Sequence, residues 1–267
     1  MTDPASYMAR LAAFRAQIPA VSPQAEWRIE FLFEALRDEC LFGTADDTLA
    51  WYEGCVAENQ MRTALIPLLE CRQWSLDSAT GSLVHASGEF FRVDGMRTFA
   101  SPTREVEGGW DQPILTQVGF DGGILGLLRK RFDGVPHYLV EAKAEPGNYR
   151  IVQITSTIQA TFSNLKRAHK GKGTPYAEYF TAPADNGGTV LIDQWMSEDG
   201  GRLNYKRNRT MLVELPESHP IELASPRYRW VSLFQLKQLL LTQDAIVAPH
   251  VRGVLACLLY TSPSPRD

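Results

Sequence analysis

Residues 138–171 read YLVEAKAEPGNYRIVQITSTIQATFSNLKRAHKG, and the interpretation of the whole chain starts from this stretch. Glu141, Lys143 and Glu145 occupy every second position before a Pro-Gly-Asn break. Successive side chains of a β-strand point to opposite faces. The spacing therefore predicts a strand that carries the three charges on one face, small apolar residues on the other, and ends at a turn.

The charged row has two interpretations. Isolated charges are costly to bury, so the row is either a solvated edge face or a set of groups paired in a polar site. Downstream, residues such as Gln159 and Thr161 alternate with apolar residues. Uncharged hydrogen-bonding side chains in such a row suit the hydroxyls of a sugar or the edges of a base, although a polar outer face has the same pattern.

Composition limits the class of protein. The chain has 267 residues, a hydrophobic fraction of 44% and a formal net charge of −4. It can build a sizeable core, and this charge balance argues against a general nucleic-acid binder. No stretch approaches the roughly 20 apolar residues of a membrane span. Charges interrupt any apolar run at the start, and the four cysteines are widely spaced, so we expect a cytoplasmic protein with reduced thiols.

Periodicity predicts helices and then strands. Residues 5–42 have the apolar spacing of two helices, and residues 43–47 are expected to close that unit. We expect a hairpin turn at Asp133-Gly134. We also expect a short strand that passes into a helix near Thr157 and ends around Gly171. The predicted strands are SLVH, EFFRV, ILTQV, GILGLLRKRF and PHYLVEAK.

Residues 201–215, GRLNYKRNRTMLVEL, form the second informative stretch. Read as one strand, it places Tyr205, Arg207 and Arg209 on the same face as an apolar row. Guanidinium groups stay charged when buried, so each arginine needs an anionic partner. That partner is Glu141 or Glu145, or the phosphates of a ligand, unless the stretch is simply a basic surface strand.

Several common catalytic motifs are absent from the sequence. It has no Walker phosphate loop, no GxGxxG fingerprint after a strand, no HExxH or paired CxxC, and no GxSxG elbow. The sequence therefore predicts an acid–base site beside anion-binding residues, with no cofactor and no metal.

The motifs EAKAEPGN, TSTIQATFSN and QWMSEDGGRLNYKRNRTMLVEL resemble the NDP-hexose 2,3-dehydratases of deoxysugar biosynthesis. The resemblance covers most of residues 51–258. It implies an α+β fold with a Nudix-like mixed sheet flanked by helices, without the Nudix metal motif. We expect an N-terminal helical segment at 1–50, the dehydratase unit at 51–258, and an unstructured tail at 259–267. That tail resembles translated adaptor sequence, so the chain is expected to be a fragment holding the first of two tandem copies.

The resemblance also implies an activity. Members act on a dTDP-4-keto-6-deoxyhexose, remove the C3 proton and expel the C2 hydroxyl, giving a 3,4-diketo-2,6-dideoxy sugar. The resemblance further implies no cofactor, a homodimer, and an unstable product that a separate ketoreductase receives. The alternative is a non-catalytic half of such an enzyme that binds the sugar nucleotide and dimerises.

Such a reaction needs a base, donors for an enolate oxygen, and an acid. We expect Glu145 or His169 to be the base, Lys143 to hold the enolate or the hydroxyl, and Tyr205 to be a possible acid. His169 could instead be a helix C-terminal residue that favours the dipole. The predicted substrate-binding residues are Arg207, Arg209 and Lys206 for the diphosphate, with Gln159, Thr161, Asn148 and Trp110.

Overall fold

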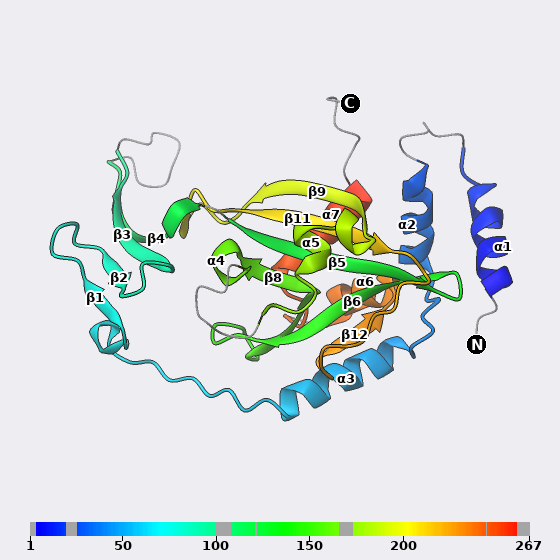
Figure 1. Ribbon diagram of the computed structural model, residues 1–267, viewed down its shortest axis with the longest axis horizontal. Coiled ribbons are helices and arrows are strands. Elements are labelled where there is room, and N and C mark those ends of the chain that lie inside the picture. The colour runs from blue at the N-terminus through cyan, green and yellow to red at the C-terminus, as the bar shows by residue number, and fades with distance from the viewer. Residues whose placement is uncertain are drawn as a thin grey trace.

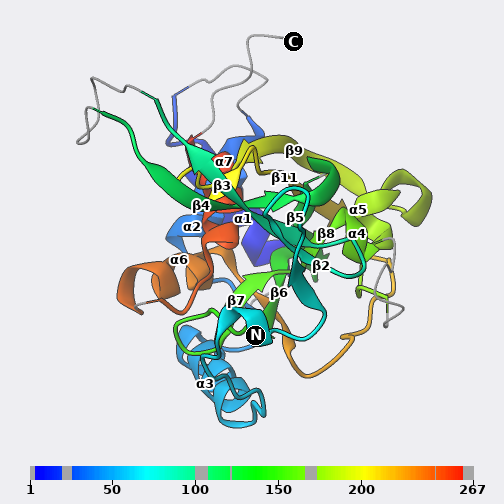
Figure 2. The ribbon, with the colours of Figure 1, turned by 90° about the vertical axis from the view of Figure 1, so that its left-hand side faces the viewer.

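The computed structural model describes residues 4–19, 26–99, 108–120, 122–165, 173–243 and 245–260. Within these ranges the chain is an α+β protein, as expected, with two mixed sheets (Figure 1). The smaller sheet projects as an arm on the left of Figure 1, and the larger sheet lies among the helices. Figure 2 views the molecule from the arm side.

The larger sheet has the strand order β12-β6-β5-β11-β9, with β7 added to β6 and β8 added to β5. Its strands are β5 (Gly123–Phe132), β6 (Val135–Ala144), β7 (Val152–Ser156), β8 (Ile158–Thr161), β9 (Thr189–Ser197), β11 (Arg207–Leu215) and β12 (Tyr228–Val231). Asp133 and Gly134 both have positive φ, 46° and 75°, as a two-residue hairpin turn requires. The expected β5–β6 hairpin is therefore confirmed.

Both faces of this sheet are covered. One face packs on α2 (Trp27–Leu36), α3 (Ala45–Ala57), α6 (Leu233–Thr242) and α7 (Pro249–Tyr260). The other face packs on α5 (Glu178–Thr181) and on the neighbouring loops. On β6, Val140 and Ala142 point into the first core and Leu139 into the second, so the predicted alternation is confirmed. The charged row of β6 lies on the side of Leu139.

A fork in the sheet creates the space for a site. β5 pairs with β6 from Leu128 onward, but before that point it pairs with β8, while β6 pairs with β7. Thr157, between β7 and β8, bridges the fork because its hydroxyl accepts from the Leu128 amide and donates to the Leu139 carbonyl. The two strands beyond this point are held apart, and the charged half of β6 faces the gap.

The expected helix near Thr157 begins later than predicted. Residues 158–161 form β8, and α4 (Phe162–Leu165) follows it. The β-branched side chains of this run favour the extended backbone, and pairing with β5 satisfies its amides. The predicted end of the helix, at Gly171, lies outside the described residues.

The N-terminal prediction is confirmed in part. Helices α1 (Pro4–Arg15) and α2 match the two expected helices. Residues 43–47 do not close the unit, because Thr44 caps α3 through a capping box with Asp47. Helix α3 therefore continues across the expected boundary at residue 50.

The smaller sheet has the order β1-β2-β3-β4-β10. Its strands are β1 (Trp74–Leu76), β2 (Leu83–His85), β3 (Phe91–Arg97), β4 (Asp111–Gln117) and β10 (Leu203–Asn204). Residues 201–215 are therefore not one strand, and that prediction is wrong. Tyr205 adopts φ 50°, which turns the chain out of β10 in the arm and into β11 in the larger sheet.

Helix α7 ends at Tyr260 and so includes the first two residues of the tail expected at 259–267. Residues 261–267 lie outside the described ranges. None of the helices in the described ranges combines the length and the apolar character that crossing a bilayer requires.

His137 provides a test of the fold through pH. It is fully buried, accepts a hydrogen bond from the Leu41 amide at Nε2, and contacts the Val135 carbonyl through Nδ1. Burial lowers its pKa to about 4. In the unfolded chain the imidazole of His137 has the ordinary pKa of 6.5, so above that pH it is neutral in both states. The contribution of the buried neutral imidazole to stability is therefore complete above pH 6.5. The contribution, about 3 kcal/mol, is lost as the pH falls from 6.5 to 4.

We therefore expect the free energy of unfolding of His137→Gln to decrease less than that of wild type between pH 7 and pH 4. Glutamine keeps an acceptor for the Leu41 amide. Urea unfolding of both proteins across this range measures the difference. A parallel decline in wild type and variant would contradict the assignment.

Candidate functional site

The fork opens into a cavity with two lobes. The Glu141 lobe has a volume of about 460 Å³ and is bounded by β6, β8 and the loops around residues 174 and 225. The Glu145 lobe has a volume of about 400 Å³ and is bounded by the ends of β6 and β8, by residues 206 and 208, and by the start of α7. Lys143 and Gln159 line both lobes and so mark their boundary.

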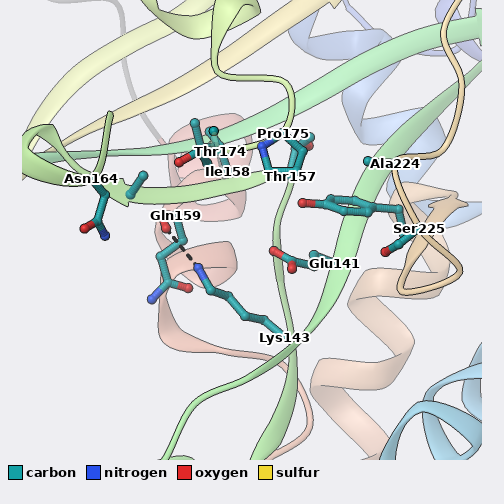
Figure 3. A pocket seen from close by; sticks show the side chains of 13 residues that line it. Glu141, Lys143, Thr157, Ile158, Gln159, Asn164, Thr174, Pro175, Ala224 and Ser225 are labelled. Carbon is teal, nitrogen blue, oxygen red and sulfur yellow. Dashed lines mark hydrogen bonds between the residues drawn. The ribbon is translucent and has the colours of Figure 1, made fainter. Parts of the chain in front are cut away.

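Lys143 is held at this boundary by the β8 backbone. Its Nζ donates to the carbonyl of Gln159 at 2.9 Å. Figure 3 shows this bond, with Glu141 and Lys143 projecting from β6 toward the lobe. The Gln159 side chain accepts from Thr155 at 2.9 Å and donates to both oxygens of Glu145 at 3.3 Å. The charged row of β6 and the row of Gln and Thr side chains on β7 and β8 therefore meet, as a polar site requires.

The Glu141 lobe contains a buried acid. Burial raises the pKa of Glu141, against the opposing effects of Lys143 and of a hydrogen bond with Tyr228. Burial and the neighbouring Glu141 raise the pKa of the Tyr228 hydroxyl. Tyr228 comes from β12, which pairs with β6 at Glu141. The sequence reasoning did not find Tyr228, because no motif links it to β6.

The Glu145 lobe contains several more ionisable groups. Lys206 donates to the side chain of Gln117, and burial lowers the pKa of its ammonium group. Asn208 donates to Glu198, which closes the lobe beside β9. His250, in the first turn of α7, completes the wall. His250 lies outside all the motifs, and Glu198 lies inside one without a pattern that distinguishes it, so neither was predicted from the sequence.

The expected convergence of two arginines on this cavity is not what the structure shows. Alternation along β11 places Asn208 in the Glu145 lobe, and Lys206 just before the strand lines it too. Arg209 is paired with Asp193 across β9, at 2.7 Å through Nε. The anionic partner of Arg209 is therefore Asp193, rather than Glu145 or Glu141. Arg207 stacks its guanidinium over Trp195 at 4.7 Å from the ring centroid.

Arg207 and Tyr205 instead line a neighbouring hollow of about 450 Å³, here called the Tyr205 pocket. Met96, Ile114 and Leu203 give this pocket apolar walls. It shares Glu198, Leu203 and Lys206 with the Glu145 lobe, so Lys206 stands between the two. Tyr205 is 85% exposed.

The remaining predicted residues are dispersed. Thr161 lines the Glu145 lobe. The backbone of Asn148 closes the turn after β6, accepting from Ile151 at 2.9 Å. Trp110 directly precedes β4 in the arm and donates to Gln112 at 2.7 Å. His169 lies outside the described residues. Among those described, no group of three or more His, Cys, Asp or Glu side chains is placed to hold a metal ion.

The profile of the NDP-hexose 2,3-dehydratase family matches residues 45–258. The chain belongs to this family. Three curated relatives carry the name dTDP-4-dehydro-6-deoxy-alpha-D-glucopyranose 2,3-dehydratase. The Saccharopolyspora spinosa protein is 40% identical over 214 residues, which cover 79% of this chain and 41% of that protein. The Amycolatopsis orientalis protein is 36% identical over 228 residues, covering 83% and 46%. The Streptomyces violaceoruber protein is 38% identical over 210 residues, covering 78% and 45%.

This NDP-hexose 2,3-dehydratase family chain thus spans less than half the length of these relatives. Among solved structures, it is similar to the Nudix hydrolase RenU from M. smegmatis, with 16% identity, a TM-score of 0.29, and coverage of 61% of this chain and 96% of that one. The C. elegans Ap4A hydrolase gives 12% identity and a TM-score of 0.28, covering 51% and 96%. At these TM-scores the likeness carries no further argument.

Proposed function

We propose that this chain carries the dehydration site for a dTDP-4-keto-6-deoxyhexose, removing the C3 proton and the C2 hydroxyl to give a 3,4-diketo-2,6-dideoxy sugar. The observation that supports this most directly is the position of Lys143. Its ammonium group lies at the junction of two lobes lined by acids and bases, on a chain of the 2,3-dehydratase family.

The chemistry follows from the acidity of the C3 proton beside the C4 ketone. When a base removes that proton, negative charge develops on the ketone oxygen. A fixed cation at that oxygen stabilises the enolate, and such stabilisation is usually the largest catalytic contribution. Lys143 is fixed by its bond to the Gln159 carbonyl and supplies this cation. The base comes from the Glu145 lobe.

The groups around Lys206 suggest how the substrate lies. With the hexose in the Glu145 lobe, the diphosphate reaches Lys206 and Arg207 at the entrance to the Tyr205 pocket. Arginine and lysine both bind phosphate oxygens well. The thymidine then occupies the apolar Tyr205 pocket, where an exposed tyrosine provides a stacking surface. In this arrangement Tyr205 binds the nucleoside, whereas the sequence had suggested it as the acid.

The test is loss of the C3 proton. We expect incubation of the purified chain with the 4-keto sugar nucleotide in deuterated water to remove the C3 proton signal from the NMR spectrum, whether by exchange or by elimination. The matched control is the 4-hydroxy analogue. Its C3 proton is not adjacent to a ketone, so the C3 signal is expected to persist. Tight binding of the ketosugar with an unchanged C3 signal would contradict catalysis and identify a binding half instead.

We further propose that the chain works as a homodimer in the cytoplasm, within a deoxysugar pathway of antibiotic biosynthesis. The product is an unstable diketone, which favours a ketoreductase acting directly afterwards. Equilibrium sedimentation of the purified chain tests the dimer.

A further inference from the structure

The segment that carries His250 is anchored to the sheet at the fork. The Ile154 amide donates to the Ile246 carbonyl and the Ala248 amide donates to the Ile154 carbonyl, both at 2.9 Å. This places the segment before α7 beside β7 as a parallel bridge. The Gln153 side chain adds a bond to the Ala245 carbonyl at 2.6 Å. His250 thus enters the Glu145 lobe from a backbone tied to β7 at several points.

The charged groups that act on His250 come from several segments around the lobe. Lys143 comes from β6 and Glu145 follows the end of that strand, while Glu198 follows β9 and Lys206 precedes β11. Burial lowers the pKa of His250 below 6.5. The carboxylates of Glu198 and Glu145 raise it, and the ammonium groups of Lys143 and Lys206 lower it further. The imidazole is therefore neutral at neutral pH and can accept a proton.

We infer that His250 is the group that removes the C3 proton and then protonates the departing C2 hydroxyl. This inference rests on the proposed dehydration, and it adds a residue that the family motifs in residues 138–215 do not contain. The hexose ring and the imidazole share the Glu145 lobe, whose volume is about 400 Å³.

The steps balance without a further reactant. The imidazole takes the C3 proton, and the C–H electron pair forms a C3=C4 bond as the ketone becomes an enolate beside Lys143. The C4 carbonyl then re-forms, the electron pair moves to C2=C3, and the C2–O bond breaks. The leaving hydroxide takes the proton from the imidazolium and departs as water, which returns neutral imidazole. The remaining enol tautomerises to the 3,4-diketone.

Glu145 has a different role in this scheme. Both its oxygens receive the Gln159 amide at 3.3 Å, so it is oriented by β8. With Glu198 it places negative charge near His250, which stabilises the imidazolium that forms during the reaction. Glu145 is thus a positioning and electrostatic residue, and His250 is the catalytic one.

The test compares His250→Gln with Glu145→Gln in the C3 proton assay across pH 4.5 to 9. Wild type is expected to lose rate at acid pH as the imidazole becomes protonated. This decrease in rate at low pH is the acid limb of the pH profile. His250→Gln is expected to lower the rate by about 10²–10⁴-fold and to abolish the acid limb. Glu145→Gln is expected to lower the rate by about tenfold and to keep an acid limb, moved to lower pH because the imidazolium has lost a carboxylate.

Substrate affinity and thermal unfolding of each variant check that the fold is retained. If His250→Gln does not fold, NMR titration of the His250 ring in wild type replaces it, and its pKa must coincide with the acid limb. An acid limb that survives in His250→Gln, or that disappears in Glu145→Gln, overturns the inference while leaving the dehydratase proposal intact. Absence of C3 proton loss in wild type overturns both.

Discussion

Replacement of Lys143 with methionine is expected to lower the rate of C3 proton loss by about 10²–10³-fold at saturating substrate. Methionine keeps much of the length and the apolar stem of the side chain but removes the ammonium group. The charge is needed most when the enolate forms, so the effect falls on the rate and less on the apparent affinity. The measurement is the C3 proton signal in deuterated water, at several substrate concentrations.

The matched control is Lys237→Met on α6. Lys237 packs its ammonium group over Phe234, 5.6 Å from the ring centroid, and lines neither lobe. We expect this variant to retain the wild-type rate. If Lys143→Met were as fast as Lys237→Met while binding the ketosugar normally, Lys143 could not be the cation that holds the enolate.

The largest effect on stability is expected at Arg129, in the middle of β5. Its side chain is 2% exposed and is enclosed by three acids from two elements. Nη2 lies 2.7 Å from Glu34 and 3.2 Å from Glu30, both on α2, and Nη1 contacts Glu214 on β11. Burial acts against its charge, but these acids raise the pKa of Arg129 well above its ordinary value. This cluster joins α2 to the central strands.

Arg129→Met is expected to lower the free energy of unfolding by about 3–5 kcal/mol, because Glu34 is left buried without its cation. Glu34 is 5% exposed and would keep only the Tyr138 hydroxyl, at 2.7 Å. Urea unfolding monitored by circular dichroism measures the change. Adding Glu34→Gln to Arg129→Met is expected to recover part of the loss, because the uncompensated charge is removed while an acceptor for Tyr138 remains.

The control for this prediction is Arg150→Met. Arg150 pairs with Glu53 at 2.7 Å, but the two side chains are 37% and 46% exposed. An exposed pair of this kind contributes less than about 1 kcal/mol. Equal losses in Arg129→Met and Arg150→Met would show that the buried cluster contributes no more than a surface ion pair.

Much of the local structure followed from the sequence because it depends on neighbouring residues. Alternation along residues 138–145 correctly placed Glu141 and Lys143 on the face opposite Val140 and Ala142, and Asp133-Gly134 correctly marked the β5–β6 turn. Pattern reasoning failed where two patterns overlapped. Residues 152–165 have both a strand and a helix period, and pairing with β5 decided for the strand up to Thr161.

Some of the candidate residues were expected to lie together for the same reason. Lys143, Glu145, Gln159, Thr161 and Lys206 do line one lobe. A single reversal of φ at Tyr205 ended the alternation assumed for residues 201–215. The assumption of one strand had placed Arg209 at the substrate, whereas Asp193 on the adjacent β9 strand neutralises it. Strand order determines that pairing, and no spacing within residues 201–215 encodes it.

By itself, then, the sequence determined the strand and helix periods, the turn that ends the charged row, and, through its long motifs, the family. Only the tertiary structure decided that β5 and β6 part at Thr157 and that His250 and Tyr228 close the resulting cavity. The physical reason is that alternation and capping arise from backbone geometry over a few residues. The meeting of groups far apart in the chain depends instead on which strands pair and where a helix is anchored.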